Sequence, residues 1–411
     1  MNVALFLAQK MRQHKQYKNT VSSRIINIAQ AAVAIGIASI LIAMACSKGL
    51  QNEIRNKTSV FNGHILVTLF ENNESQVSLI PFEDSAETRS QLVSHQDFDR
   101  MHAIALKAGM FKTNDNFEGI LLKGVGSDFQ WSSLESFLTE GSFPDYEFGL
   151  SNEILISEIV ANRLNLKVGE SVDAYFQNEL NSALPKRRKF KITGLFFSGF
   201  PYIDENLIYA DLRQVQRLNQ WEENQIGGYE VFITSFQKVA QITNQIYKKL
   251  PSDLNSIAIS DRFSSIYQWI SLFDFNVLII LVVMLLVGVI NMATALLVLI
   301  LERSRMVGLL KALGAPHPMI QKIFLYNGIA IMSKGLLFGN LIGFLFYFSQ
   351  QQWGWISLDP STYFVSKAPV ALSWFEALSI NLFFLILATL LLWIPSKIVI
   401  KISPSRVLRF R

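Results

Sequence analysis

Few residues of this 411-residue chain are arranged for catalysis or metal binding. The five histidines are scattered and never pair at a metal-ligand spacing. They are His14, His64, His95, His102 and His317. The phosphate-binding pattern Gly-x-x-x-x-Gly-Lys-Ser/Thr does not occur, nor does a Gly-x-Ser-x-Gly nucleophile motif. The single cysteine, Cys46, excludes a disulfide scaffold and a cysteine-based metal cluster. We therefore predict a chain with no catalytic residue, no metal and no bound cofactor.

The segment 302–322 is the one most suited to contact a partner. Large apolar residues recur there at helical spacing, with basic residues at the other positions. The apolar residues are Met306, Leu309, Leu310 and Leu313. Gly314 and Pro316 follow them, as at the end of a helix. The pattern predicts a short amphipathic helix that either lies on lipid or is gripped by a soluble partner.

Three glycines recur every four residues in one apolar run, at Gly335, Gly339 and Gly343. This spacing places them on one helix face, where another backbone can approach closely, although glycine is also common in membrane helices. We predict a packing seam against a helix of this chain or of a partner. Lys334, next to the stripe, either lines a polar path or snorkels toward the membrane surface.

A basic cluster ends the polar loop 177–189. It consists of Lys186, Arg187, Arg188 and Lys189. Such a cluster either docks an acidic partner surface or is a solvated hairpin.

Four long apolar runs must position these segments. They span 25–47, 277–301, 323–348 and 377–396. Each has at least 20 residues, enough to cross a hydrocarbon layer about 30 Å thick. The composition agrees, because only 17% of residues are charged, against about 25% in soluble domains. We predict transmembrane helices at 25–47, 275–301, 323–348 and 375–396.

The net charge of +5 is distributed unevenly. The segments 1–24, 302–322 and 397–411 carry 14 basic residues and one acidic residue, whereas 48–274 carries 21 basic and 29 acidic residues. Short basic segments stay on the cytoplasmic side of a membrane. Both termini and 302–322 are therefore predicted inside, with 48–274 and the loop 349–374 outside. Basic residues that flank a membrane also argue against nucleic acid as a partner.

The external segment 48–274 has mixed α and β patterns. We expect strands at 64–70, 119–125, 171–176 and 189–197, a strand and helix in 153–166, and a strand-helix-strand unit in 229–260. We also expect a helix over 94–107 and a polar loop over 72–90.

Glu302-Arg303-Ser304-Arg305 and the following 308–315, Gly-Leu-Leu-Lys-Ala-Leu-Gly-Ala, resemble the coupling segment of FtsX/MacB-type ABC permeases. That family's pattern is E-R-x-R-E-I-G-x-L-K-A-L-G-A, and Met306-Val307 replaces Glu-Ile here. Pro395 and the tail 404–409 resemble the family's closing motif. Within this superfamily the chain is most similar to LolC/LolE-type lipoprotein-releasing permeases. The similar segments are 63–65, 122–125, 157–170 and 194–199, with Tyr363 and Pro369.

The resemblance implies four transmembrane helices with a large α+β extracytoplasmic domain, of two subdomains, between the first and second helices. It implies a non-catalytic subunit that pairs with a second permease chain, identical or paralogous, in the membrane lipid of the bacterial inner membrane. Two copies of a separate ATPase subunit would bind ATP and Mg. The residues that would couple to that ATPase are Glu302, Arg303, Arg305, Met306, Leu309, Lys311, Leu313, Gly314 and Ala315.

The resemblance further implies extraction of lipoproteins and their transfer to a periplasmic carrier. Acyl chains would lie between the first two helices. The lining residues would be Leu41, Met44, Phe273 and Val277. In one of the two Lol permeases a hairpin docks the carrier, and 177–189 occupies the matching place. Two alternatives share the architecture: a MacB-like mechanotransmission permease for efflux, and an FtsX-like permease that activates a cell-wall hydrolase.

Overall fold

The structure is a computed structural model. It describes residues 3–13, 21–72, 76–114, 116–177 and 185–398. The chain divides into two compact units. The membrane unit comprises Met1–Asn52, Ile270–Ser357 and Lys367–Arg411, and the α+β unit comprises Glu53–Trp269 and Leu358–Ser366. The tail motif at 404–409 lies outside the described residues.

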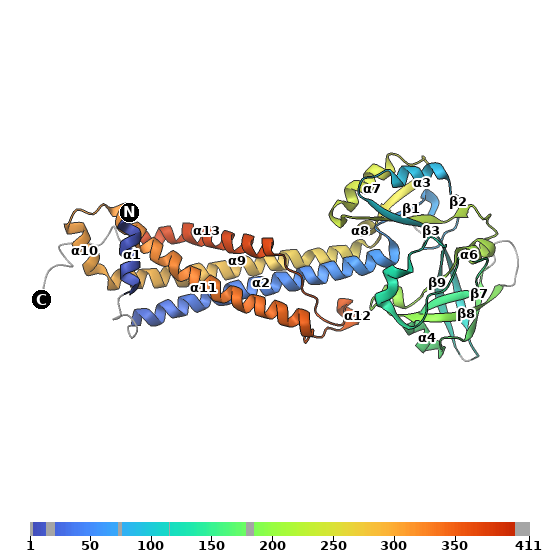
Figure 1. Ribbon diagram of the computed structural model, residues 1–411, viewed down its shortest axis with the longest axis horizontal. Coiled ribbons are helices and arrows are strands. Elements are labelled where there is room, and N and C mark those ends of the chain that lie inside the picture. The colour runs from blue at the N-terminus through green and yellow to red at the C-terminus, as the bar shows by residue number, and fades with distance from the viewer. Residues whose placement is uncertain (1–2, 14–20, 73–75, 115, 178–184, 399–411) are drawn as a thin grey trace. The chain divides into compact units, whose positions relative to one another are not determined.

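Among the residues described, four helices are long and apolar enough to cross a membrane. They are α2 (Val21–Asn62), α9 (Ser264–Glu302), α11 (His317–Trp353) and α13 (Trp374–Ser396), which are labelled in Figure 1. Each overlaps one of the predicted apolar runs and extends beyond it. Hydropathy marks only the part suited to lipid, whereas helical hydrogen bonding propagates into neighbouring polar residues. Two shorter helices, α1 (Val3–Gln13) and α10 (Ser304–Ala312), also belong to the membrane unit.

The four helices of the membrane unit share one apolar core. Val33, Ile37, Met292, Phe384 and Leu392 are buried in it, and each of the four helices contributes to the cluster.

Polar contacts fix the start of α13. Ser373 and Glu376 form a capping box, with each side chain accepting from the other's backbone N–H at 3.2 Å. The Glu376 carboxylate also forms an ion pair with Lys48 of α2. The Ser-x-x-Glu spacing is a sequence signature of such a cap, and the sequence analysis overlooked it.

One ten-stranded sheet organises the α+β unit, in the order β12-β1-β11-β3-β4-β9-β6-β8-β5, with β7 pairing with β3 and β8. Its strands are β1 (Ile65–Leu69), β3 (Phe98–Lys112), β4 (Phe117–Val125), β5 (Leu138–Gly141), β6 (Glu153–Ser157), β7 (Ser171–Phe176), β8 (Lys186–Phe196), β9 (Leu207–Asp211), β11 (Gly228–Ile233) and β12 (Leu254–Ala258). A small second sheet pairs β2 (Phe82–Glu83) with β10 (Gln225–Ile226).

Short helices surround this sheet. They are α3 (Ala86–Val93), α4 (Glu158–Leu164), α5 (Pro201–Asp204), α6 (Leu212–Asn219), α7 (Val239–Tyr247), α8 (Ile259–Arg262) and α12 (Pro360–Tyr363). There are also 3₁₀ turns at Phe70–Asn72, Trp131–Phe137 and Phe236–Lys238. One apolar cluster packs α7 against β1, β11 and β12, and another packs α4 and α6 against β4, β6 and β8.

The predicted strand-helix-strand unit in 229–260 is confirmed as β11, α7 and β12. Both strands pair antiparallel with β1, which lies between them, so β11 and β12 are parallel to each other. The strands expected near 64–70, 119–125, 171–176 and 189–197 are likewise confirmed as β1, β4, β7 and β8, and 153–166 contains β6 and α4.

Two local predictions are wrong. The residues 94–107 were expected to be helical, but most of them form β3, a central strand paired with β11 and β4. Six consecutive residues, 102–107, are buried there, and the four apolar residues among them, 103–106, fit a helical period as well as a strand. The expected polar loop 72–90 contains β2 and most of α3, whose N-cap Ser85 accepts from the Thr88 N–H.

Candidate functional site

The predicted short helix after the second membrane helix is confirmed as α10. Its end is a Schellman motif: Ala315 N–H donates to the Leu310 carbonyl at 2.9 Å, and Gly314 N–H donates to that of Lys311 at 3.0 Å. Gly314 has φ +83°, a conformation that glycine adopts without steric cost. Gly314 therefore marks the end of the helix because the left-handed backbone conformation there favours glycine.

The apolar residues of α10 divide between two faces. Val307 is fully buried against Leu299 and Phe324, with Met306 and Leu310 partly buried beside it. Leu309 and Leu313, which lie away from Val307 on the helix, are 53% and 75% exposed. The four predicted apolar positions thus differ in burial, and Val307, which was not among them, is the buried anchor. The consequence is an exposed apolar ridge, Leu309 and Leu313, one helical turn apart.

The charged residues of the same segment differ in exposure. Glu302 and Arg305 are exposed, whereas Arg303 and Lys311 are partly buried. Burial lowers the pKa of Arg303 and of Lys311. An exposed apolar ridge with basic neighbours is suited to binding a protein surface and offers no group for covalent chemistry.

The three glycines of α11 face α2. A Cβ at Gly335 would lie 2.8 Å from the Val33 Cβ, and one at Gly343 would lie 2.9 Å from a Leu41 methyl carbon. One at Gly339 would be closer still to the α2 backbone. Since Cβ atoms do not approach other atoms so closely, α11 and α2 pack together only because these positions are glycine.

The predicted acyl-chain lining residues do not form one surface. Leu41 is only 1% exposed and contacts Gly343, so it belongs to the seam between α2 and α11 and does not face open space. Met44 is partly buried against the membrane core, and Phe273 and Val277 are partly exposed on α9. Leu41 is therefore withdrawn from the lining set.

Polar groups also occur within the membrane helices. Lys334 is exposed on α11. Asn340 of α11 and Asn381 of α13 exchange two amide hydrogen bonds, at 2.7 and 2.8 Å. The sequence analysis overlooked this pair, whose only signal was an asparagine in each of two apolar runs.

The basic cluster Lys186–Lys189 lies in strand β8, not in the loop where it was predicted, and the loop residues 178–184 lie outside the described residues. Lys186 donates to the Leu218 carbonyl at 2.7 Å. Arg187 makes a bidentate pair with Asp173 at 3.0 and 2.7 Å, which lowers the pKa of that carboxyl. Lys189 is exposed on the same strand.

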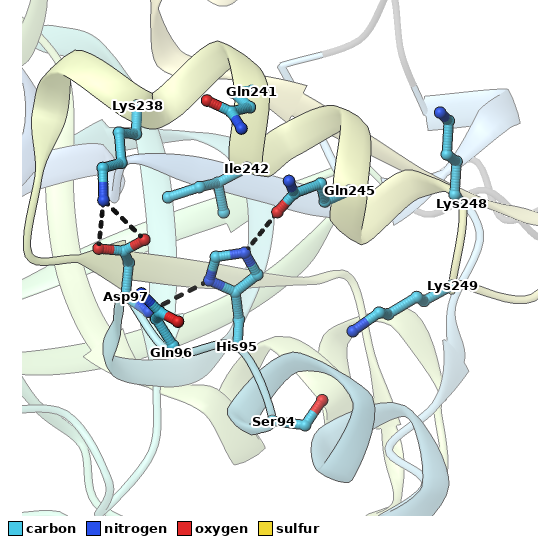
Figure 2. Close-up of a pocket in the computed structure, with 10 residues that line it drawn as sticks. All are labelled: Ser94, His95, Gln96, Asp97, Lys238, Gln241, Ile242, Gln245, Lys248 and Lys249. Carbon is cyan, nitrogen blue, oxygen red and sulfur yellow. Dashed lines mark hydrogen bonds and ion pairs between the residues drawn. The ribbon is translucent and has the colours of Figure 1, made fainter.

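A polar cleft of about 640 Å³ opens between α7 and the loop before β3 (Figure 2). The Lys238 ammonium pairs with Asp97 at 3.1 Å, and the His95 Nε2 lies 2.7 Å from the Gln245 side-chain oxygen (Figure 2). The sequence analysis did not single out this cleft. Throughout the part of the chain that the structure describes, no group of His, Cys, Asp and Glu side chains could hold a metal ion.

Four apolar helices and a large α+β unit are the architecture expected of a membrane permease. Residues 28–262 match the family described as MacB-like periplasmic core domain, and residues 278–404 match the FtsX-like permease C-terminal family. Since the first match covers more than half of the chain, the chain belongs to the MacB-like periplasmic core domain family and is a non-catalytic ABC permease subunit.

Its curated relatives carry more particular names. The chain is 20% identical to "Lipoprotein-releasing system transmembrane protein LolE" of Haemophilus influenzae, over 99% of both chains. It is 23% identical to the corresponding LolC protein of Buchnera aphidicola subsp. Schizaphis graminum, over 93% of both chains. It is also 20% identical to LolC of Neisseria meningitidis serogroup B, over 96% of both chains.

Proposed function

We propose that this chain is the permease subunit of an ABC transporter that extracts lipoproteins from the inner membrane and hands them to a periplasmic carrier. The observation that carries the proposal is the similarity, over almost the whole length of both chains, to relatives named as lipoprotein-releasing permeases. A match confined to one domain would not support a particular substrate.

The proposed topology follows from charge. Both termini and α10 lie in the cytoplasm, because the segments around them are strongly basic. The α+β unit is inserted between the first and second membrane helices and faces the periplasm. The excess of acidic over basic residues in 48–274 supports the periplasmic side, because only an excess of basic residues retains a segment in the cytoplasm.

Two features support the proposed partners: the absence of a P-loop from the sequence and the exposed ridge of α10. The sequence contains no P-loop, so ATP and Mg are bound by a separate ATPase, in two copies, one for each of two permease chains. The exposed ridge of Leu309 and Leu313, with Glu302, Arg303, Arg305, Lys311 and Ala315 around it, is the contact for that ATPase.

The proposed substrate path lies between α2 and α9. Met44, Phe273 and Val277 remain its candidate lining residues, because each is partly exposed on one of these helices. Arg187 and Lys189, the exposed members of the basic cluster, are the candidates for carrier docking.

Depletion followed by membrane fractionation tests the proposal. On depletion, lipoproteins destined for the outer membrane should accumulate in the inner membrane, while an outer-membrane β-barrel protein, the control, keeps its location. Re-expression of the chain should restore the distribution. Lipoproteins that still reach the outer membrane after full depletion would contradict lipoprotein release. Accumulation of an exported small molecule or arrest of cell separation would then favour the efflux or hydrolase-activating alternatives.

A further inference from the structure

A buried lysine lies at the end of the first membrane helix. Lys123, on β4, is 2% exposed, and its ammonium lies 2.7 Å from the backbone carbonyl oxygen of Phe61. Phe61 is in the last turn of α2, which ends at Asn62. The last four carbonyls of a helix have no partner within the helix and carry the negative end of its dipole. Lys123 therefore supplies a positive donor to the end of α2 that belongs to the α+β unit.

The same ammonium is held by an acid on another strand. It lies 2.7 Å from both carboxylate oxygens of Glu230 on β11, and Glu230 is also 3.0 Å from the His102 Nε2 on β3. Burial alone would raise the pKa of Glu230, but the charge of Lys123 and the hydrogen bond from His102 lower it. Burial lowers the pKa of Lys123, and the charge of Glu230 opposes that shift. Each group thus favours the charged form of the other.

This cluster spans the centre of the sheet. Strands β11, β3 and β4 are neighbours in that order, and each contributes one of the three side chains. Gly63, just after α2, brings the chain directly against β11: a Cβ there would lie 2.9 Å from the Glu230 Cβ. The end of α2 is therefore joined to three strands at one point.

The beginning of α9 is tied to the same place. The Thr58 and Tyr267 hydroxyls are 2.9 Å apart. The Tyr267 ring stacks on the Phe236 ring, with centroids 5.7 Å apart. The Arg55 guanidinium lies over the Phe236 ring, 5.4 Å from its centroid. All of these residues belong to the α+β unit.

We propose that Lys123 and Glu230, with the Thr58–Tyr267 contact, are positioning residues that make the ends of α2 and α9 move with the central strands. Displacement of these helices during ATP hydrolysis is thereby passed to β4 and β11. The inference rests on the proposed function for its energy source, the partner ATPase. Apolar residues of similar volume often replace a buried ion pair without loss of stability. Stability alone therefore does not account for a buried pair at this position.

The test uses the complete complex with its ATPase in proteoliposomes and the variant Lys123→Met/Glu230→Met. Replacing both partners avoids an unpaired buried charge. Hydrogen exchange of the β4 and β11 amides is measured with and without ATP. In wild type ATP should change this exchange. In the variant the change should fall by at least about fivefold, while ATP hydrolysis stays within about twofold and the melting temperature within a few degrees.

The matched control is Lys191→Met/Glu153→Gln, which removes another ion pair of the same unit, at 4.0 Å, between β8 and β6, two strands that pair with neither β4 nor β11. It should leave the ATP response as in wild type. An unchanged response in the Lys123/Glu230 variant overturns the proposal, as does a wild-type complex that hydrolyses ATP with no response.

If the double variant does not fold, the variant Tyr267→Phe is measured instead, because it deletes only the hydroxyl that contacts Thr58. An unchanged response to ATP in this variant also overturns the proposal. Lipoprotein release is measured on the same samples. A complex that responds to ATP but releases no lipoprotein contradicts the proposed function, but not the proposed role of Lys123 and Glu230.

Discussion

A Cβ at Gly339 of α11 would lie 2.6 Å from the carbonyl oxygen of Ala34 on α2. The obstacle is backbone, which cannot rotate away as a side chain can. Gly339→Ala should therefore push the two helices apart and destabilise the chain by about 1–3 kcal/mol, despite the better helix propensity of alanine. Thermal unfolding of the purified protein in detergent measures this effect.

Gly36 provides a matched control for that substitution. It is also a helical glycine, on α2, but a Cβ there would meet its nearest neighbour, the Met284 carbonyl oxygen, at an ordinary 3.6 Å. Gly36→Ala should be neutral or stabilising by up to about 1 kcal/mol. Equal destabilisation by both substitutions would contradict close packing at Gly339.

Aspartate at the exposed ridge of α10 should uncouple the ATPase. Leu309→Asp/Leu313→Asp places two charges where an apolar contact is proposed, so the amount of ATPase that copurifies should fall at least about tenfold. The fold should survive, because both side chains are more than half exposed.

The control for the ridge is Gln9→Asp, which adds an exposed charge on α1, outside the segment 302–322. Copurification and transport should stay near wild type. If the ridge variant still binds the ATPase and supports transport, α10 is not the coupling contact.

Stability of the α+β unit should decline in mild acid because of His64. Burial, with a smaller contribution from Arg100, lowers the pKa of His64 from 6.5 to about 4. The unfolded chain binds a proton near pH 6.5, whereas the folded chain does so only near pH 4. Stability from the neutral ring is thus complete above pH 6.5 and is lost as the pH falls toward 4, by about 3 kcal/mol at most.

The variant His64→Asn checks this pH dependence. The ring Nδ1 accepts from the Ile233 N–H at 3.0 Å, and an asparagine oxygen can take that place without titrating. The melting temperature between pH 7 and pH 4 should fall less steeply in the variant than in wild type. Parallel pH profiles would show that His64 does not control this dependence.

The Asn340–Asn381 pair predicts non-additive substitution effects. Asn340→Leu leaves the Asn381 amide without its partner in an apolar setting, whereas Asn340→Leu/Asn381→Leu leaves none. The double variant should be at least as stable as either single variant, with a coupling energy of about 0.6 kcal/mol. Unfolding in detergent of all three variants measures it, and additive effects would mean that the two amides act independently.

Sequence patterns predicted the elements whose conformation depends on residues near them in the chain. The membrane helices, the Gly314 helix end and the hairpin of β7 and β8 were predictable because hydropathy and turn chemistry are read over a few residues. Strand β3 was not, since its buried apolar residues owe their conformation to β11 and β4. The Lys123 cluster was also out of reach, because Phe61, His102 and Glu230 become neighbours only through the strand order.

The position of β1 between β11 and β12 has a consequence for biogenesis. This strand is made directly after α2, yet both of its hydrogen-bonding partners are made last, just before α9. Until then its two edges are open, and unpaired apolar strands invite wrong pairing. The sheet of the α+β unit therefore cannot close around β1 until β11 and β12 have been made.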